Sequence, residues 1–346
     1  MDSAPLTVGT AGEFNLVARL RAICAATTSP DTIIGIGDDT AVLRLDDREV
    51  LLATCDIQIE GTHFRFDTIS PYQLGRRAIA VNLSDIAAMG GHPTHAFVSL
   101  ALPSDFPVAD FDALFEGMRD MMAAHGASID GGNLAASGDH LMIDVFLLGR
   151  AEKSALRTRA GAHPGDGIYI TGSVGASSAG LAVLTKYGSA HPALFRDLVR
   201  VHLEPQPRVA AGIALAQSGA VTAMIDISDG LAADLGHVCD SSNAGAEIEY
   251  DIIPHRPEID TVARELNREP AGYVLYGGED YELLFTVSPE READIAGLSA
   301  TIGLPMTRIG RITGERGRIS VLDKNGSAKP LTGTGWDHFR KTDNRM

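Results

Sequence analysis

Short apolar segments that read as strands alternate along this chain with longer segments of helical spacing, and a polar stretch divides the series in two. The dividing stretch, 152–167, is rich in Arg, Gly and Pro, as is typical of an interdomain linker. We therefore predict two domains, over residues 1–150 and 151–346. In each one, strands and helices mix in an α/β fold of the α+β type. A length of 346 residues also suggests about two domains.

The periodicity places the individual elements. In the first unit it predicts helices over 13–24, 71–89 and 109–125, and strands over 41–45, 50–55, 97–102 and 141–149. In the second unit it predicts helices over 177–186, 208–218 and 231–241, and strands over 167–171, 223–227 and 281–287. Ser70 is expected to cap the helix whose first residue is Pro71, because Ser is a favoured N-cap and Pro a favoured first helical residue.

Charge and cysteine content exclude several classes of protein. The chain carries 29 Lys and Arg against 45 Asp and Glu, a formal net charge of −16, without the basic run of a nucleic-acid binder. We find no apolar run of membrane-spanning length and no secretory signal pattern, so no membrane association is expected. The cysteines Cys24, Cys55 and Cys239 form no CxxC pair, which favours a reducing cytoplasm over a disulfide or zinc framework.

The stretch GIGDDTAVL, 35–43, puts two adjacent carboxylates before a strand, where they repel each other. One interpretation is a Gly/Asp turn that leads into the strand. The other is a site for a divalent metal ion, with Asp38 and Asp39 as hard oxygen donors. A bound cation relieves the repulsion, and it also lets an acidic protein hold a phosphate group.

Two further motifs in the first half place polar side chains beside apolar strands and helices. Asp56 closes an apolar strand, and His63 follows seven residues later. Both residues could be ligands. The alternative is that Asp56 only ends the strand and that His63 is a loop histidine with a structural hydrogen bond. Asp85 falls on the apolar stripe of the helix over 71–89. A buried carboxylate needs a metal ion or a salt bridge, and Arg76 or Arg77 is the alternative partner.

The remaining motifs lie at glycine turns and at a strand end. Residues 129–137, IDGGNLAAS, are interpreted as a tight loop between strands, in which a glycine pair is followed by Asn133. In AMIDISDGLAADL, 223–235, Asp226 ends a strand, while Ser228 and Asp229 either cap the next helix or join a ligand site at the strand end. Glu279 follows a glycine pair in YGGEDYELLF, 276–285.

Taken together, these motifs favour phosphoryl transfer that depends on several Mg²⁺ ions. Neither GxxxxGK[ST] nor GxGxxG is present, so ATP would be bound without a P-loop. A zinc hydrolase would cluster His or Cys, and a glycosidase needs only two carboxylates. Acidic residues spread over both domains with glycine turns suit a multi-metal site better.

The order of the motifs resembles the thiamine-monophosphate kinases, in the superfamily of aminoimidazole-ribotide synthase and its relatives. The matching stretches are GEF at 12–14, GIGDD at 35–39, NLSDIAAMG at 82–90, RAGAHPGD at 159–166, IDISDGLAADLGH at 225–237, GGEDYELLFT at 277–286 and WDHF at 336–339. The resemblance implies in-line transfer of the ATP γ-phosphate to thiamine monophosphate, with several Mg²⁺ ions, stimulation by K⁺, and no covalent nucleophile or general base. It also implies a homodimer whose N-terminal domains pair into a β-barrel.

Position by position, the resemblance implies roles for individual residues. The metal ligands would be Asp39, Thr54, Cys55, Asp56, Asp85, Asn133, Asp226 and Asp229. The ATP contacts would be Gly132, Asn133, Arg159 and Ser228. The substrate contacts would be His63, Glu279 and Trp336, where Trp336 either stacks on the thiazolium ring or closes the core.

The chain departs from the family pattern at two positions. It reads GGNLAAS where the family reads GGDTTR, so Asn133 offers a carbonyl oxygen without a charge. Cys55 stands where Thr is usual, and because a thiol is a poor Mg²⁺ ligand, only its backbone carbonyl would serve. The alternatives are another ATP-using enzyme of the superfamily and a nucleotide-binding relative without catalytic activity.

Overall fold

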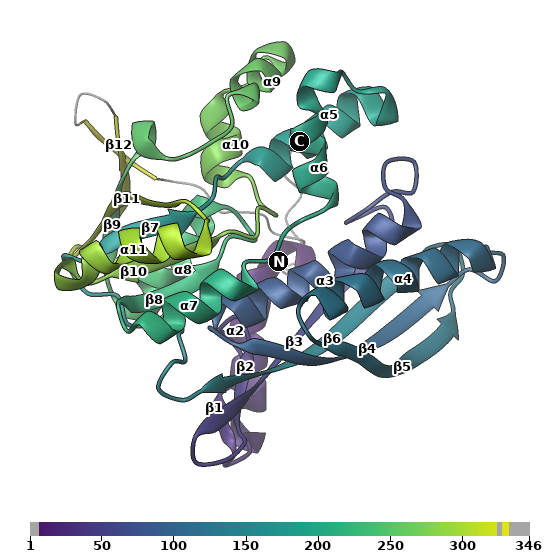
Figure 1. The fold of residues 1–346 in the computed structure, drawn as a ribbon, viewed down its shortest axis with the longest axis horizontal. Helices are drawn as coiled ribbons and strands as arrows, with labels where there is room; N and C mark the ends of the chain where they lie inside the picture. The colour runs from purple at the N-terminus through teal and green to yellow at the C-terminus, as the bar shows by residue number, and fades with distance from the viewer. Residues whose placement is uncertain (1–6, 324–326, 332–346) are drawn as a thin grey trace, which may run out of the picture.

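Two mixed β-sheets, one in each half of the chain, form the framework of the computed structural model, which describes residues 7–323 and 327–331 (Figure 1). The first sheet has the strand order β1-β2-β3-β6-β4-β5, and all neighbours are antiparallel except β4 and β5. Its strands are β1 (Thr32–Ile34), β2 (Ala41–Arg44), β3 (Glu49–Ile59), β4 (His92–Leu102), β5 (Ser128–Ala136) and β6 (Met142–Glu152). Helices α1 (Val8–Ala11) and α2 (Glu13–Cys24) precede it.

Helices α3 (Pro71–Ala88) and α4 (Val108–Ala124) cover one face of this first sheet (Figure 1). The start of α3 agrees with the prediction, because the Ser70 side chain accepts a hydrogen bond from the Gln73 backbone N–H and Pro71 is the first helical residue. On the opposite face of the sheet, large apolar side chains are exposed, among them Ile57 at 47%, Phe97 at 38% and Phe146 at 40%.

The second sheet has the order β13-β12-β9-β11-β7-β10-β8, in which β12 and β9 are the parallel pair. Its strands are β7 (Gly167–Thr171), β8 (Val221–Asp226), β9 (Gly245–Glu249), β10 (Leu283–Val287), β11 (Met306–Thr313), β12 (Ile319–Leu322) and β13 (Ala328–Pro330). The helices are α5 (Ala176–Tyr187), α6 (Arg196–Leu203), α7 (Val209–Ser218), α8 (Leu231–Ser242), α9 (Glu258–Leu266), α10 (Pro270–Tyr276) and α11 (Glu292–Ile302).

Helix α3 is the element that joins the two halves. It packs on β3, β4 and β6 of the first sheet, and it also contacts β8 and α7 of the second half. Glycines allow its close neighbours to approach: a Cβ on Gly75 would lie 1.9 Å from the Leu114 carbonyl oxygen of α4. A Cβ on Gly212 of α7 would lie 2.1 Å from the Ala87 carbonyl oxygen. The backbone of α3 is therefore in direct contact with helices on both sides.

Two expectations about the first half are wrong in detail. The segment 129–137 is not a tight loop: residues 129–136 belong to β5, which pairs in parallel with β4. Gly132 has φ +152° there, and a Cβ on it would lie 1.9 Å from the Val98 carbonyl oxygen, so the glycine permits strand pairing and does not mark a turn. Asp56 does not close its strand, because β3 continues to Ile59.

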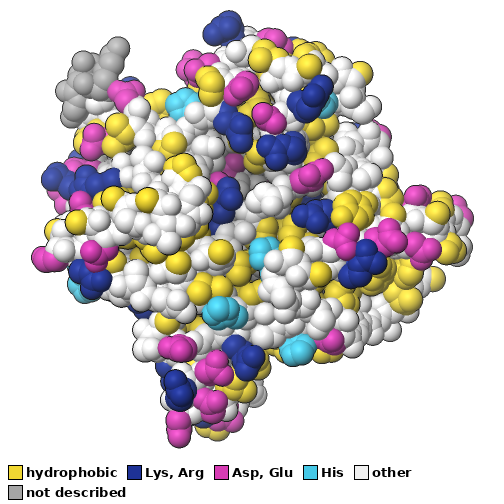
Figure 2. All heavy atoms as spheres, viewed as in Figure 1, with side chains coloured by type: hydrophobic (Ala, Val, Ile, Leu, Met, Phe, Trp, Pro, Cys, Tyr) yellow, Lys and Arg dark blue, Asp and Glu magenta, His cyan; other side chains and the backbone are white. Residues whose placement is uncertain are grey.

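The stretch 153–166 between β6 and β7 has no regular secondary structure, as expected of a linker, yet it is fixed to both halves. The Arg157 backbone N–H donates to the Met89 carbonyl, and the Arg157 side chain donates to the Ala216 carbonyl. A boundary at residue 150 stays a prediction. On the face shown in Figure 2, acidic and basic side chains are interspersed. Within the described residues, no helix combines the length and apolar character that a bilayer crossing requires.

Candidate functional site

Three carboxylates from distant parts of the sequence meet between the two halves of the chain. Asp39 lies in the loop before β2, Asp85 in the last turns of α3, and Asp226 at the end of β8. One oxygen from each lies within 4.8 Å of the others. We call Asp39, Asp85 and Asp226 the acidic triad. Three motifs that the sequence singled out separately are thus parts of one site.

Each member of the acidic triad is held by a neighbour. Thr54 Oγ1 donates to Asp85 at 2.5 Å, and Ser84 Oγ donates to Asp226 at 2.6 Å. Asp39 is paired through one carboxylate oxygen with Arg159, whose Nε lies 3.0 Å away. Its other oxygen, Oδ2, is buried and has no hydrogen-bond partner among the described residues. A buried acceptor without a partner is costly in a folded protein, so this atom is a natural place for a cation.

The pKa values of the acidic triad show the same crowding. Burial, followed by the charge of Asp39, raises the pKa of Asp226 to about 7. Burial and the neighbouring charges of Asp56 and Asp226 raise the pKa of Asp85 well above its usual value. Burial also raises the pKa of Asp39, although the Arg159 guanidinium opposes the shift. Arg159 therefore compensates the negative charge at this site only in part, as expected of a site built for a cation.

Strand β3 presents its residues alternately to the two faces of the first sheet. Thr54 is buried on the face that carries α3, where Asp56 also affects the pKa values of Asp85 and Asp226. Cys55 points the other way: its thiol is exposed and lies 3.1 Å from Asp144 Oδ1 on β6. The thiol of Cys55 is therefore not directed at the acidic triad, which leaves only its backbone for the predicted role.

Asp38 does not join the acidic triad, but it lies beside it. Its carboxylate accepts the Asp39 backbone N–H and lies 3.8 Å from Arg159 Nε. Burial and the charge of Asp39 raise the pKa of Asp38 to about 6. A hollow of about 530 Å³ opens next to this pair, lined by the glycine-containing loop 35–37 and by residues of β2 and β3. This volume is in the range that small-molecule sites occupy.

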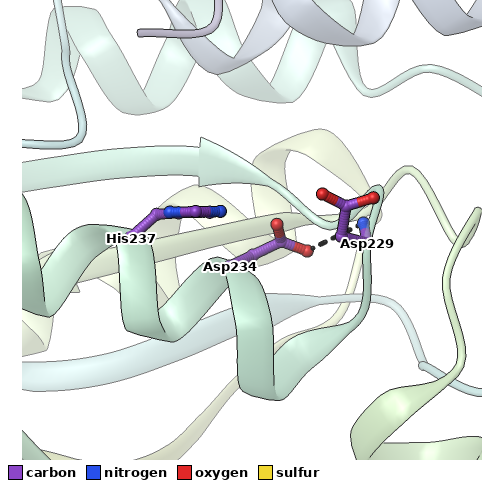
Figure 3. A group of neighbouring side chains, drawn as sticks. All are labelled: Asp229, Asp234 and His237. Carbon is purple, nitrogen blue, oxygen red and sulfur yellow. Dashed lines mark hydrogen bonds between the residues drawn. The ribbon is translucent and has the colours of Figure 1, made fainter. Parts of the chain in front are cut away.

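A second polar group was only partly predicted. Asp229 lies in the loop before α8, and Asp234 and His237 lie one turn apart on that helix, all three close together (Figure 3). Asp234 accepts the backbone N–H groups of Asp229 and Gly230 at 3.2 and 3.1 Å. The Asp234 carboxylate therefore fixes the loop before α8. The alternative that Ser228 or Asp229 caps the helix is wrong, since the N-cap is Gly230 and no side-chain cap hydrogen bond is formed there. The i, i+3 spacing of Asp234 and His237 was the signal that could have identified them.

The predicted substrate residues gather around one arginine. Arg77 forms an ion pair with Glu279, so it does not serve as the partner of Asp85 that we considered. His63 accepts the Ile59 backbone N–H through Nδ1, which is the structural hydrogen bond expected of a loop histidine. The His63 carbonyl lies 3.5 Å from Arg77 Nη2. Trp336 lies outside the described residues.

The predicted ATP residues are more dispersed. Arg159 lies against Asp39, and the Ser228 carbonyl accepts the Glu279 backbone N–H at 2.7 Å. Gly132 and Asn133 are exposed on β5, at the edge of the first sheet. Because β5 is three strands from β3 and strands are spaced by about 4.8 Å, Asn133 lies on the order of 14 Å from β3. The role of Asn133 as a metal and ATP ligand stays a prediction.

Comparison with known proteins identifies the relatives of this fold. Residues 37–151 match the family model "AIR synthase related protein, N-terminal domain", and residues 163–323 match its C-terminal counterpart. The chain is 35% identical to the thiamine-monophosphate kinase of Escherichia coli K12 over 330 residues, which is 95% of this chain and 98% of that protein. Its identity to the Bacillus subtilis thiamine-monophosphate kinase is 31%, over 95% and 99% of the two chains.

A solved structure gives the same result at the level of the fold. The structure described as "AaThiL complexed with AMPPCP and TMP" superposes with a TM-score of 0.84 and 32% sequence identity. The match covers 97% of this chain and 100% of the other. The similarity therefore extends over both sheets, with the segment that carries Arg159 between them.

Proposed function

The chain belongs to the thiamine-monophosphate kinases, a family of AIR synthase-related proteins, and we propose that it transfers the γ-phosphate of ATP to thiamine monophosphate at the acidic triad. The product is thiamine diphosphate, and the reaction class is that of an ATP-dependent phosphotransferase. The observation that carries the proposal is the acidic triad itself. Its three carboxylates come from both halves of the chain, and one of their buried oxygens has no hydrogen-bond partner among the residues that the structure describes.

Mg²⁺ fits the donors at this site. It prefers carboxylate oxygens and keeps water and substrate phosphates as its other ligands. Asp39, Asp85 and Asp226 would hold the first ion, and Thr54, Cys55 through its backbone, Asp56, Asn133 and Asp229 are the further ligands that we propose. When bound, Mg²⁺ neutralises the charge that two approaching phosphate groups share. Stimulation by K⁺ is part of the proposal.

The chain's own residues position the reactants. Arg159 lies beside Asp39 and would contact the ATP phosphates, together with Gly132, Asn133 and Ser228. His63, Glu279 and Trp336 would contact thiamine monophosphate. The acceptor is a phosphate monoester with a second pKa of about 6, so it is largely ionised near neutral pH and needs no general base. Transfer then depends on alignment of the two phosphates and on exclusion of water, without a covalent intermediate on the protein.

A second copy of the chain would cover the exposed apolar face of the first sheet. Ile57, Phe97 and Phe146 form a patch there, and the ring centroids of the two phenylalanines are 6.4 Å apart. Apolar surface of this kind usually marks an interface. We propose a homodimer in which two N-terminal sheets pair into a barrel. We expect the enzyme to act in the cytoplasm, where free thiols such as Cys24, Cys55 and Cys239 stay reduced.

The proposed function is tested by incubating the chain with ATP, Mg²⁺, K⁺ and thiamine monophosphate and separating the thiamine esters by chromatography. Thiamine serves as a parallel acceptor. We expect thiamine diphosphate from the monophosphate. Asp226→Asn keeps the shape of the side chain but removes a charge at the acidic triad, so turnover should fall roughly a hundredfold or more.

The matched control is Asp112→Asn, the same change at an exposed position on α4. It should keep turnover within about twofold of the unsubstituted chain, since surface substitutions away from a site have small effects. ATP binding without diphosphate formation would contradict the proposal and would indicate a nucleotide-binding relative that has lost catalysis. An equal loss of turnover in the Asp112→Asn variant would show that the loss in Asp226→Asn does not arise from the acidic triad.

A further inference from the structure

The loop that carries Glu279 is held in an unusual backbone conformation. Glu279 has φ +65° and Tyr281 has φ +52°, and the other non-glycine residues with positive φ in the described chain are Asn243 and Asn267. Asn tolerates this region, whereas Glu and Tyr adopt it rarely. A conformation of this kind persists only where the surroundings enforce it.

The backbone of this loop is fixed from within the second half. The Glu279 N–H donates to the Ser228 carbonyl at 2.7 Å, and the Tyr281 N–H donates to the Ile227 carbonyl at 2.9 Å. The buried Asp280 carboxylate accepts the backbone N–H groups of Gly175 and Ser177. These contacts place Glu279, but they do not orient its carboxylate.

The carboxylate of Glu279 is oriented by Arg77, a residue of the first half. Arg77 projects from α3, and its side chain is 1% exposed. Nη2 pairs with Glu279 Oε1, and Nη1 donates to the His202 carbonyl at 2.7 Å. The same Nη2 lies 3.5 Å from the His63 carbonyl. One guanidinium therefore touches both residues proposed to contact the substrate in the described chain, and also α6.

The Glu279 side chain keeps an open side, being 30% exposed. His202 Nδ1 lies 3.4 Å from Glu279 Oε2 and 3.1 Å from Ser177 Oγ. Although burial alone would raise the pKa of Glu279, the Arg77 guanidinium holds it below its usual value. The carboxylate is thus ionised, aimed and partly accessible.

We propose that Arg77 is a positioning residue for thiamine monophosphate, which sets the direction of the Glu279 carboxylate and ties it to the His63 loop. The inference rests on the proposed function, because it takes Glu279 and His63 as substrate contacts. Arg77 acts through these groups and does not touch the reacting phosphates. A lysine could keep the charge of Arg77, but it lacks the planar fork that reaches three partners at once.

The test compares Arg77→Lys and Arg77→Met with the unsubstituted chain in steady-state kinetics. We expect KM for thiamine monophosphate to rise roughly tenfold or more in Arg77→Met and less in Arg77→Lys, because the charge-assisted contact is lost or weakened. KM for ATP should stay within about twofold, since nothing at the acidic triad changes. A general loss of structure would instead change both KM values and lower the unfolding midpoint.

Gln73 provides the matched control. It lies one turn before Arg77 on α3, and its Nε2 donates to Glu204 Oε1 of the second half at 2.7 Å. Gln73→Ala removes this contact between the halves and also the Gln73 Oε1 acceptor of the Ser70 backbone N–H, while the described contacts of Glu279 stay in place. It should leave KM for thiamine monophosphate within about twofold of the unsubstituted chain.

A double variant decides whether Arg77 acts through Glu279. If it does, the double variant Arg77→Met, Glu279→Gln should have a KM for thiamine monophosphate only slightly higher than that of Glu279→Gln alone. Additive losses, or an unchanged KM in Arg77→Met, would overturn the inference. Diphosphate formation by the unsubstituted chain tests the proposed function separately, so the two ideas fail on different measurements.

Discussion

His202 shows how strongly the interior of this protein restricts a single ionisable group. Its side chain is 6% exposed and lies between Ser177 and Glu279. Burial, assisted by the charge of Arg77, lowers the pKa of His202 to about 4. His202 is therefore neutral in the folded chain at neutral pH. Upon unfolding below about pH 6.5 it gains a proton, because an exposed histidine has a pKa near that value.

We predict that His202 makes the folded chain less stable as the pH falls from about 6.5 to about 4. Over this window the unfolded state binds more protons than the folded state, so the free energy of unfolding decreases, by about 2 kcal/mol between pH 7 and pH 5. His202→Gln, which cannot be protonated, should lose less stability over the same interval. Urea denaturation at the two pH values measures the difference.

His92→Gln is the control for this measurement, because His92 is exposed at the start of β4. Its pH dependence should match that of the unsubstituted chain. If His202→Gln and His92→Gln lose stability equally between pH 7 and pH 5, the interpretation of His202 as a buried neutral group is wrong.

At the scale of elements, helix packing depends on glycines that face a neighbouring backbone. A Cβ on Gly117 of α4 would lie 2.0 Å from the Tyr72 carbonyl oxygen of α3, and Gly75 makes the reciprocal approach to Leu114. Gly297 of α11 has no atom within 4 Å of the same position. Gly117 and Gly297 therefore both lie in a helix interior, but Gly117 faces a neighbouring backbone and Gly297 faces open space.

Alanine at these two glycines should therefore change stability in opposite directions. Gly117→Ala is expected to lower the free energy of unfolding by about 1–3 kcal/mol, because the helix backbones must separate. Gly297→Ala should raise it by about 0.5–1 kcal/mol, because alanine favours the helix and nothing obstructs its methyl group. Thermal or urea unfolding measures both, and a gain in stability for Gly117→Ala would contradict the close contact of α3 and α4.

The sequence predicted elements whose signals are local. The start of α3 was identified from Ser70 and Pro71, and β7 was predicted with the observed bounds. The segment 129–137 was misread because a glycine pair signals a turn, whereas Gly132 serves the close approach of β4, a contact that depends on the tertiary fold. The partial burial of Asp85 followed from helix periodicity.

Contacts between distant segments could not be predicted in the same way. Arg77 and Glu279 are 202 residues apart, and a sequence gives no measure of which arginine meets which carboxylate. The helix of Asp234 was predicted, but the hydrogen bonds that its carboxylate accepts from the preceding loop were missed, because side-chain contacts to such a loop are expected at the N-cap position.

At the scale of the whole molecule, the exposed face of the first sheet predicts the oligomeric state. If a second copy covers it, Phe146→Asp should place an uncompensated charge in the interface and shift the chain to monomers, because an unpaired buried charge costs several kcal/mol. Light scattering coupled to size-exclusion chromatography measures this shift. Val108→Asp is the control, since Val108 is 74% exposed at the start of α4, away from this face. A monomeric unsubstituted chain at micromolar concentration would contradict the dimer.

Helix α3 couples the stability of the two halves. Thirteen of its eighteen residues are buried, and its neighbours belong to both sheets. Detaching either half would strip one flank of this helix and expose its apolar side chains to water, along with Asp85 and Arg77. Transient opening at the boundary therefore costs the burial of core side chains as well as the contacts between the halves. A quality-control protease that needs a loosened half should therefore cleave the folded enzyme slowly.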